Sequence, residues 1–245
     1  MNSKTGIEWT EVTWNPVTGC TKISAGCKNC YAERMAKRLR LMGSRRYMNE
    51  FAVTLHEDLL DFPKKMRAPR QIFVNSMSDL FHDLVPLEFI QKVFATMNAC
   101  PQHVFQILTK RSTRLAELAD KLVWTKNIWM GVTVEDDANK HRIKNLKKVP
   151  AAVRFISFEP LLSEICHPDL TGINWVIVGG ESGPGARPIK KEWVESLQES
   201  ARINHIPFFF KQWGGTNKKK AGKLLNGRLC QEIPDQTPSQ LSTAG

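Results

Sequence analysis

The sequence predicts an α/β fold: a (β/α) barrel of six or seven parallel strands, either complete or incomplete. Strand-like runs recur along the chain with helical patterns between them, and this alternation implies parallel strands joined by right-handed crossovers. Several runs, such as Trp175–Val178, are apolar throughout, as expected for strands covered on both faces. A doubly wound open sheet is the alternative, because periodicity does not distinguish an open sheet from a closed one.

The elements can be placed in chain order from the apolar pattern. Strands are expected at Ile7–Trp14, Gln71–Asn75, His103–Leu108, Asn127–Val132, Ala152–Ser157, Ile173–Val178 and Pro207–Lys211. Helices are expected at Asn29–Met42, Pro86–Asn98, Arg111–Leu122, Asp136–Lys148 and Lys190–Asn204, with a short turn near Leu161–Ile165. Residues 1–213 would form one barrel domain, with a small insertion at about 44–70 that contains a short strand, Phe51–Leu55. Residues 214–245 form a basic and then polar tail, whose end, 236–245, is typical of disorder.

The charge balance restricts the class of partner. The 35 lysines and arginines exceed the 24 aspartates and glutamates, which gives a net charge of +11. This excess favours a polyanionic partner, and nucleic acid before a membrane surface, because neither end carries a basic amphipathic anchor. No apolar run approaches the roughly 18 residues of a membrane span, and the start lacks a secretory signal. We therefore expect a cytoplasmic protein.

Polar residues follow the carboxyl ends of six predicted strands, the edge at which barrels and open α/β sheets bind ligands. In chain order they are Asn75, Ser76 and Asp79; Lys110 and Arg111; Thr133 and Glu135; Ser157 and Glu159; Gly179, Gly180 and Glu181; and Lys211. Because the carboxyl ends of parallel strands meet at one edge, these residues predict a single polar mouth. Such a mouth favours an enzyme over a pure binding module.

The cysteines give the most specific signal. Cys20, Cys27 and Cys30 have the spacing C-x6-C-x2-C in the loop between the first strand and the first helix, whereas Cys100, Cys166 and Cys230 are scattered. Three thiolates on one short loop can hold three irons of a [4Fe–4S] cluster and leave the fourth iron open to another ligand. The amides at the start of the following helix would favour an anionic cluster and lower the thiol pKa values.

Two other interpretations of the cysteines remain open. A structural zinc site normally needs four ligands, and Cys166 with His167 could complete one if that loop folds back. The three thiols could also be unpaired structural residues without a metal.

Several motifs together resemble the phage-associated three-Cys-motif protein family, from about Trp9 to Pro234. These motifs are Trp14–Cys20, Cys27–Glu33, Ser157–Leu161, Gly179–Gly183 and Phe210–Gly215. Three cysteines after the first strand of a (β/α) barrel also resemble the radical S-adenosylmethionine superfamily, whose usual spacing is C-x3-C-x2-C. The superfamily's glycine-rich stretch follows its second strand, whereas the glycines here follow the sixth. Family members commonly have an aromatic residue at the position of Cys230, which implies that Cys230 is not a ligand.

The superfamily resemblance implies a partial TIM barrel, a [4Fe–4S] cluster and S-adenosylmethionine chelated to the open iron. Electron transfer from the reduced cluster would cleave S-adenosylmethionine to a 5′-deoxyadenosyl radical, and a reductant such as flavodoxin or ferredoxin would supply the electron. Asn75, Ser76 and Asp79 would then accept the methionyl amine. The ribose and adenine would extend over Thr133, Glu135, Ser157, Glu159, Gly179, Gly180 and Glu181, with the glycines allowing a close approach of the backbone. The alternative for the three glutamates is an ion pair with a lysine or arginine of the mouth.

Basic residues on and beyond the first helix predict contacts with nucleic-acid phosphates. The residues concerned are Arg34, Arg38, Arg40, Arg45 and Arg46, together with Lys110, Arg111 and Lys211 near the mouth. A solvated helix face is the alternative, although a solvated face usually mixes charges of both signs.

The sequence thus favours a radical S-adenosylmethionine enzyme that modifies or repairs nucleic acid. Two alternatives stay open: a non-catalytic iron–sulfur or zinc protein that binds nucleic acid, and a cluster-based redox enzyme without S-adenosylmethionine. The pattern assigns no catalytic residue and no oligomeric state.

Overall fold

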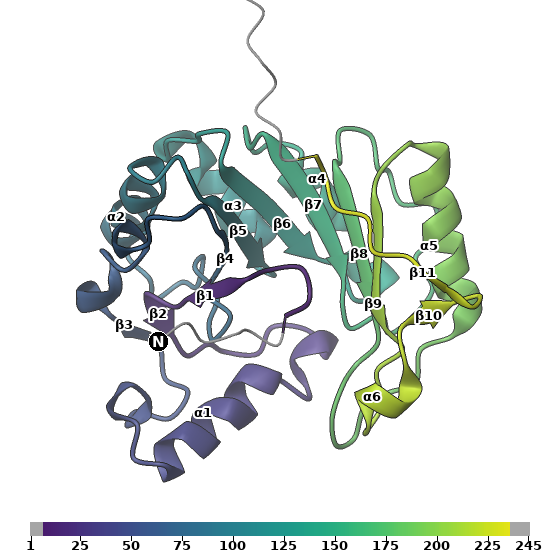
Figure 1. Cartoon of the computed structure of the whole chain (residues 1–245), viewed down its shortest axis with the longest axis horizontal. Coiled ribbons are helices and arrows are strands. Elements are labelled where there is room, and N and C mark those ends of the chain that lie inside the picture. Colours follow the sequence, from purple (N-terminus) through teal and green to yellow (C-terminus); the bar gives the residue numbers. More distant parts are fainter. Residues whose placement is uncertain (1–6, 236–245) are drawn as a thin grey trace, which may run out of the picture.

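The computed structural model describes residues 7–235, in which seven parallel strands form one sheet. The strand order is β1–β4–β5–β6–β7–β8–β9, without a pair between β1 and β9 in the described residues. The strands are β1 (Val12–Trp14), β4 (Gln71–Val74), β5 (Val104–Thr109), β6 (Ile128–Thr133), β7 (Val153–Phe158), β8 (Trp175–Gly179) and β9 (Phe208–Gln212). Figure 1 shows the sheet curling into a half-barrel. The predicted barrel is confirmed in its incomplete form.

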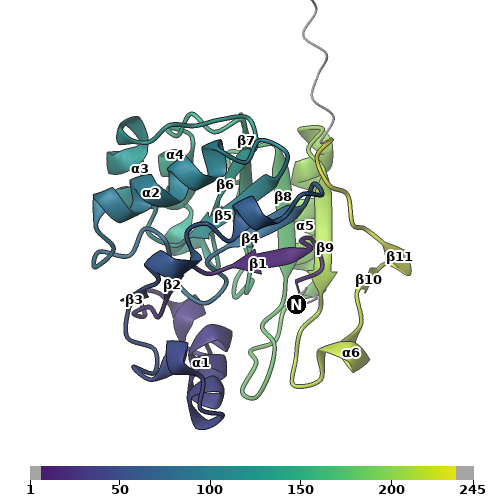
Figure 2. The ribbon, with the colours of Figure 1, turned by 60° about the vertical axis from the view of Figure 1, so that its left-hand side comes forward.

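Four helices cover the convex face of the sheet (Figures 1 and 2). They are α2 (Leu87–Asn98), α3 (Ser112–Leu118), α4 (His141–Leu146) and α5 (Lys191–Ile203). Their apolar stripes meet every second residue of the strands in one large core, as Phe94 of α2 and Leu197 of α5 illustrate. Helix α1 (Tyr31–Leu41) is separate from this layer and lies at the carboxyl ends of the strands.

Two helical regions are shorter than their patterns predicted. The predicted helix 136–148 divides into a 3-10 turn, η6 (Asp137–Asn139), and α4, and the helix 111–122 divides into α3 and η5 (Ala119–Lys121). The connection between β7 and β8, where a short turn near Leu161–Ile165 was expected, has no helix. Pro160 and Pro168 disfavour helical backbone there, and the extended segment instead buries Leu161, Ile165 and Leu170 in the main core.

The insertion and the tail are both attached to the half-barrel. In the insertion, β3 (Thr54–Leu55) pairs antiparallel with β2 (Val17–Thr18), and the remainder forms the 3-10 turns η2 (Arg45–Tyr47), η3 (Glu57–Leu59) and η4 (Pro63–Lys65). The tail contains α6 (Lys218–Ala221), β10 (Leu224–Leu225) and β11 (Arg228–Leu229). It then runs beside β9, where the Phe210 amide donates to the Cys230 carbonyl at 2.7 Å, and so covers that edge of the sheet. The predicted disordered end, 236–245, lies outside the described residues.

Aromatic rings fill the concave interior of the half-barrel. This aromatic layer consists of Trp9, Phe73, Trp129, Phe155, Trp175 and Phe209. The Trp175 ring is central, with centroids 5.6 Å from Phe155, 5.8 Å from Trp9 and 6.1 Å from Phe209. A Cβ atom at Gly131 would lie 2.4 Å from the Phe155 ring, so only glycine fits this position of β6. Because side chains alternate along a strand, Ser157 follows Phe155 on the same face, nearer the mouth.

No helix within residues 7–235 is long and apolar enough to cross a membrane.

Replacing Trp175 by alanine should lower the free energy of unfolding by about 3–5 kcal/mol, because the cavity left among four rings cannot collapse. Urea denaturation of both proteins measures this difference. Trp193 on α5 is only half-buried, so Trp193→Ala is the matched control and should cost less. Equal losses in the two variants would contradict the central position assigned to Trp175.

Candidate cofactor site at the mouth of the half-barrel

The three clustered cysteines lie on a loop at the carboxyl ends of the strands, which we call the cysteine loop (residues 19–31). Its first residues are fixed by the backbone: the Gly19 amide donates to the Met77 carbonyl at 3.0 Å, and the Cys20 amide donates to the Phe51 carbonyl at 3.1 Å. Gly19 has φ of +85°, and a Cβ atom there would lie 2.1 Å from the Ala52 carbonyl oxygen. The insertion therefore requires glycine immediately before the first cysteine.

Arg111, just after β5, connects the start of the cysteine loop to the sheet. Its Nη2 donates to the carbonyl of Thr21 at 3.2 Å and to its hydroxyl at 2.9 Å, and its Nη1 lies 3.4 Å from the Cys20 sulfur. The buried Asp79 carboxylate, 3.3 Å away, balances its charge and also accepts from the Thr109 hydroxyl at 2.6 Å. Asp79 and Arg111, predicted for cofactor and nucleic acid respectively, are thus paired with each other beneath the loop.

Glu135, just after β6, holds the middle of the cysteine loop. Its carboxylate accepts a hydrogen bond from the Ser24 hydroxyl and is paired with Arg142 of α4 at 2.7 Å. Glu135 is fully buried and Arg142 is 4% exposed. The same Arg142 Nη1 donates to the carbonyl of Thr133 at 2.8 Å, so the predicted residue Thr133 contributes its backbone.

Glu181, just after β8, holds the end of the cysteine loop. It accepts from Asn29 Nδ2 at 3.0 Å and from Arg187 through Nε at 2.9 Å and Nη2 at 2.6 Å. Arg187 Nη2 also donates to the Ala25 carbonyl at 2.9 Å. Burial raises the pKa of Glu181, but the hydrogen bonds from Arg187 and Asn29 outweigh burial and lower it to about 2.

The three thiols of the loop are free and partly exposed. Burial and then the Asp79 carboxylate raise the pKa of Cys20, Arg111 offsets part of the increase, and the resulting pKa is about 11. The sequence-based expectation of a lowered pKa is therefore wrong for Cys20, because its partial burial and the nearby Asp79 carboxylate disfavour the thiolate. Of the other cysteines, Cys100 is buried, Cys166 is exposed and Cys230 packs against the main core.

The described residues do not contain a preformed site for a single metal ion. Within residues 7–235, no group of three or more His, Cys, Asp or Glu side chains converges on a point where one metal ion could sit. Cys20, Cys27 and Cys30 are unpaired thiols on one loop, and cysteine thiolates are the ligands that iron–sulfur clusters use. Cys166 is held by Asp137 and Lys140, where its amide donates to Asp137 at 2.9 Å, and does not form a fourth ligand here.

The ends of β7, β8 and β9 form a second polar group in the mouth. Glu159 is paired with Lys211 at 3.1 Å and accepts from the Ser157 hydroxyl at 3.1 Å. A Cβ atom at Gly179 would lie 2.5 Å from Glu159 Oε1, and one at Gly180 would lie 2.1 Å from the Trp213 carbonyl oxygen. These glycines allow segments of the protein itself to approach closely. All three predicted glutamates are therefore in ion pairs, as the alternative interpretation stated.

The end of β4 has an unused donor. Asn75 is buried with φ of +61°, its Oδ1 accepts from the Val17 amide at 3.2 Å, and its Nδ2 has no hydrogen-bond partner in the described part of the chain. Ser76 donates to Asn15 Oδ1 at 3.1 Å. An unsatisfied buried donor beside the cysteine loop is costly unless a ligand or water accepts from it.

The predicted basic face is partly neutralised. Arg34 donates to the carbonyls of Ser182 and Pro184, and the insertion supplies acidic partners, Glu50 for Arg40 and Asp58 for Arg46. Part of the predicted basic face is therefore balanced by acidic residues of the insertion. Arg38 and Arg45 are exposed, and their guanidinium groups have no partner within residues 7–235.

Sequence reasoning missed Ser24, Asn29, Arg142 and Arg187, which connect the cysteine loop to the strand ends. The two arginines could have been found from the sequence, because three glutamates at a mouth need counter-charges. Arg142 follows Glu135 by seven residues, and Arg187 follows Glu181 by six. No local pattern marks the contacts of Ser24 and Asn29.

Comparisons with known proteins give one family and one kind of enzyme fold. The family described as "Protein of unknown function (DUF5131)" matches residues 4–234. No curated protein matches the sequence. A cysteine-to-serine variant of spore photoproduct lyase superposes with a TM-score of 0.52 at 13% identity, covering 73% of this chain and 58% of that one. A variant of the same enzyme with bound AdoMet and dinucleoside spore photoproduct has a TM-score of 0.50 at 11% identity, covering 89% and 69%.

The chain thus spans little more than half the length of the first of these structures. At such low identity the likeness shows the fold alone, and it confirms the predicted partial TIM barrel. The structural neighbours are enzymes.

Glu181 should make stability depend on pH between about 4.5 and 2. In this window the unfolded chain binds a proton at this carboxyl group and the folded chain does not, so stability falls as pH falls. Glu181→Gln should remove this dependence and reduce the loss of unfolding free energy between pH 5 and pH 3 by about 2 kcal/mol. Urea titrations at both pH values measure the loss, with the exposed Glu164→Gln as control. If both variants follow the wild type, Arg187 and Asn29 do not stabilise the Glu181 carboxylate.

Proposed function

The chain belongs to the family described as "Protein of unknown function (DUF5131)", and we propose that it is an iron–sulfur enzyme of the radical S-adenosylmethionine type that acts on nucleic acid. One observation carries the proposal: three free thiols on one loop, fixed across the carboxyl edge of a parallel half-barrel. That edge is where α/β barrels hold their active sites.

Cys20, Cys27 and Cys30 would hold three irons of a [4Fe–4S] cluster. Arg111, with Nη1 3.4 Å from the Cys20 sulfur, would compensate part of the cluster's negative charge. Bound together, the reduced cluster and S-adenosylmethionine would supply a 5′-deoxyadenosyl radical for hydrogen abstraction, and a flavodoxin or ferredoxin would be a suitable electron donor.

The residues of the mouth would bind and orient S-adenosylmethionine. The spare Nδ2 donor of Asn75 lies just after β4, the strand that pairs with β1, and beside the start of the cysteine loop. There it would meet the methionyl carboxylate, with Ser76 and Asp79 as its neighbours. Ser157, Glu159 and Lys211 lie over the aromatic layer and are suited to the ribose hydroxyls. The aromatic layer closes the interior below them and excludes water. AdoMet bound to the spore photoproduct lyase variant, a protein of similar fold, supports the choice of cofactor.

A nucleic-acid substrate is supported by three observations. The net charge is +11, Arg38 and Arg45 are exposed without partners in the described residues, and a structural neighbour binds a dinucleoside lesion. Modification and repair of a base both fit this description. A cluster-based redox enzyme without S-adenosylmethionine is the second candidate, favoured by the fact that Glu135 and Glu181 are already engaged in holding the loop.

Anaerobic reconstitution of a matched pair of triple variants tests the proposal. Wild type and the variant with Cys100, Cys166 and Cys230 replaced by alanine should each bind about four irons and four sulfides per chain. The variant with Cys20, Cys27 and Cys30 replaced by alanine should bind almost none, because its loop has lost every thiolate. Iron and sulfide analysis with the visible absorption spectrum gives the readout.

The same samples, reduced with dithionite in the presence of S-adenosylmethionine, should form 5′-deoxyadenosine only when the loop cysteines are intact. Chromatography of the quenched reaction measures it. A cluster that survives loss of the three loop cysteines would refute the ligand assignment. A stable cluster without any 5′-deoxyadenosine would favour the redox alternative.

A further inference from the structure

A cleft of about 600 Å³ opens between the cysteine loop, α3 and α4, on the side of the mouth where Lys110 and Arg111 lie. Ile23 of the cysteine loop forms one wall, and residues 110–118 and 139–142 form the floor and the opposite wall. Its volume is sufficient for a nucleotide. Arg111 and Arg142 hold the cysteine loop, and the open space in front of them has no role in the site described above.

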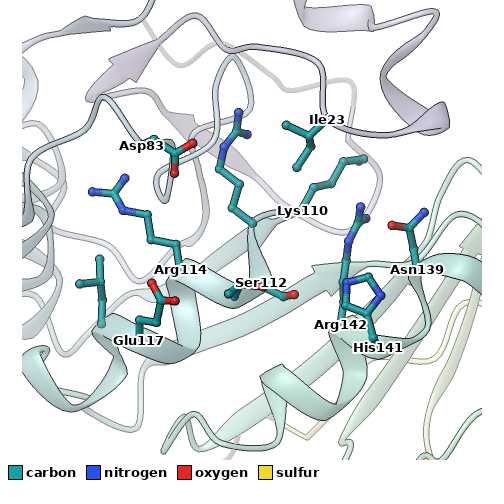
Figure 3. A pocket seen from close by; sticks show the side chains of 12 residues that line it. Ile23, Asp83, Lys110, Ser112, Arg114, Glu117, Asn139, His141 and Arg142 are labelled. Atoms are coloured by element: carbon teal, nitrogen blue, oxygen red, sulfur yellow. The ribbon is translucent and has the colours of Figure 1, made fainter.

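The two ends of the cleft differ in charge. Figure 3 shows Lys110, Asn139, His141 and Arg142 gathered at one end, beside Ile23. Asp83 and Glu117, the two exposed carboxylates of the lining, lie at the other end with Arg114. Arg114 donates to the carbonyls of His82 and Val85, the latter at 2.7 Å. A ligand with one negative group would therefore be oriented, with that group toward Lys110.

Lys110 is a cation of the cleft whose charge is not balanced by a carboxylate of the described residues. It is half-buried, yet its Nζ has no hydrogen-bond or ion-pair partner in the part of the chain that the structure describes. Arg142 uses only its Nη1 for Thr133 and Glu135, which leaves further donors of a nearly buried guanidinium. Arg111, 7% exposed, also lines the cleft and has an unsatisfied buried Nε. Donors of this kind are satisfied well by the several oxygens of a phosphate group.

The cleft is also connected to the cysteine loop through both arginines. Arg111 contacts Thr21 and Cys20, and Arg142 contacts Ser24 through Glu135. An anion bound in the cleft would thus act on two groups that fix the loop. This arrangement differs from a general basic surface, where bound phosphates contact only flexible side chains.

We propose that this cleft binds the phosphate group of a nucleotide, with Lys110 as its principal cation and Arg142 as a second donor. The phosphate has two possible sources, the backbone of a nucleic acid or a free mononucleotide. Binding of a nucleic-acid backbone rests on the proposed function, whereas the affinity of the cleft for a nucleotide phosphate does not depend on it.

Fluorescence anisotropy with the full-length protein tests the proposal. The probe is a short fluorescein-labelled single-stranded oligonucleotide, and adenosine 5′-monophosphate and inorganic phosphate serve as competitors. Lys110→Gln should weaken the affinity about tenfold and lower the slope of log affinity against log salt by about one unit. Lys148→Gln removes the same charge from an exposed lysine outside the cleft and should change the affinity less than twofold.

The competitors identify the source of the phosphate. If the oligonucleotide depends on Lys110 and the monophosphate competes only weakly, the cleft binds a nucleic-acid backbone. If only the monophosphate depends on Lys110, as measured by its direct titration, the cleft binds a free nucleotide. If Lys110→Gln and Lys148→Gln behave alike with every probe, the proposal is overturned. Formation of 5′-deoxyadenosine, measured on the same preparations, reports separately on the proposed function.

Discussion

Buried charges at the strand ends hold the cysteine loop, and the candidate site depends on these contacts. Fixing a loop of this length costs roughly 1–2 kcal/mol of conformational entropy per residue, which three thiols alone cannot offset before a cofactor binds. Arg111, Glu135 and Glu181 contact the start, the middle and the end of the loop. The counter-charges of Arg111 and Glu135 are buried, whereas Arg187, the counter-charge of Glu181, is partly exposed. Removing one partner of such a pair leaves an uncompensated charge and typically costs about 3–5 kcal/mol.

The convex face of the sheet contributes the main core, and the concave face contributes residues of the candidate site. On the convex face, alternate apolar side chains pack against four helices and form the main core. On the concave face, an aromatic layer fills the lower interior, and the same strands then present Thr133, Ser157 and Glu159 at the mouth. Because side chains alternate along a strand with a period of two residues, the same strands place polar groups directly above the aromatic layer, which excludes water.

The alternation of apolar strands and helices predicted the fold, and the spacing of Cys20, Cys27 and Cys30 predicted which loop lies at the mouth. Between β7 and β8 the pattern predicted only a short turn near Leu161–Ile165, and the structure has no helix or strand there. The contacts of the cysteine loop could not be predicted. Ser24 and Glu135 are separated by 111 residues, and Asn29 and Glu181 by 152, so that only the curl of the sheet brings them together.

The binding of S-adenosylmethionine to a cluster on this loop is the central claim, and electron paramagnetic resonance of the reduced, reconstituted protein tests it most directly. S-adenosylmethionine that coordinates the open iron must change the g values of the reduced cluster, because the ligand set of one iron changes. The account predicts a saturable change in the spectrum during the titration. A spectrum that stays unchanged at saturating S-adenosylmethionine, in protein with a full complement of iron and sulfide, would contradict it.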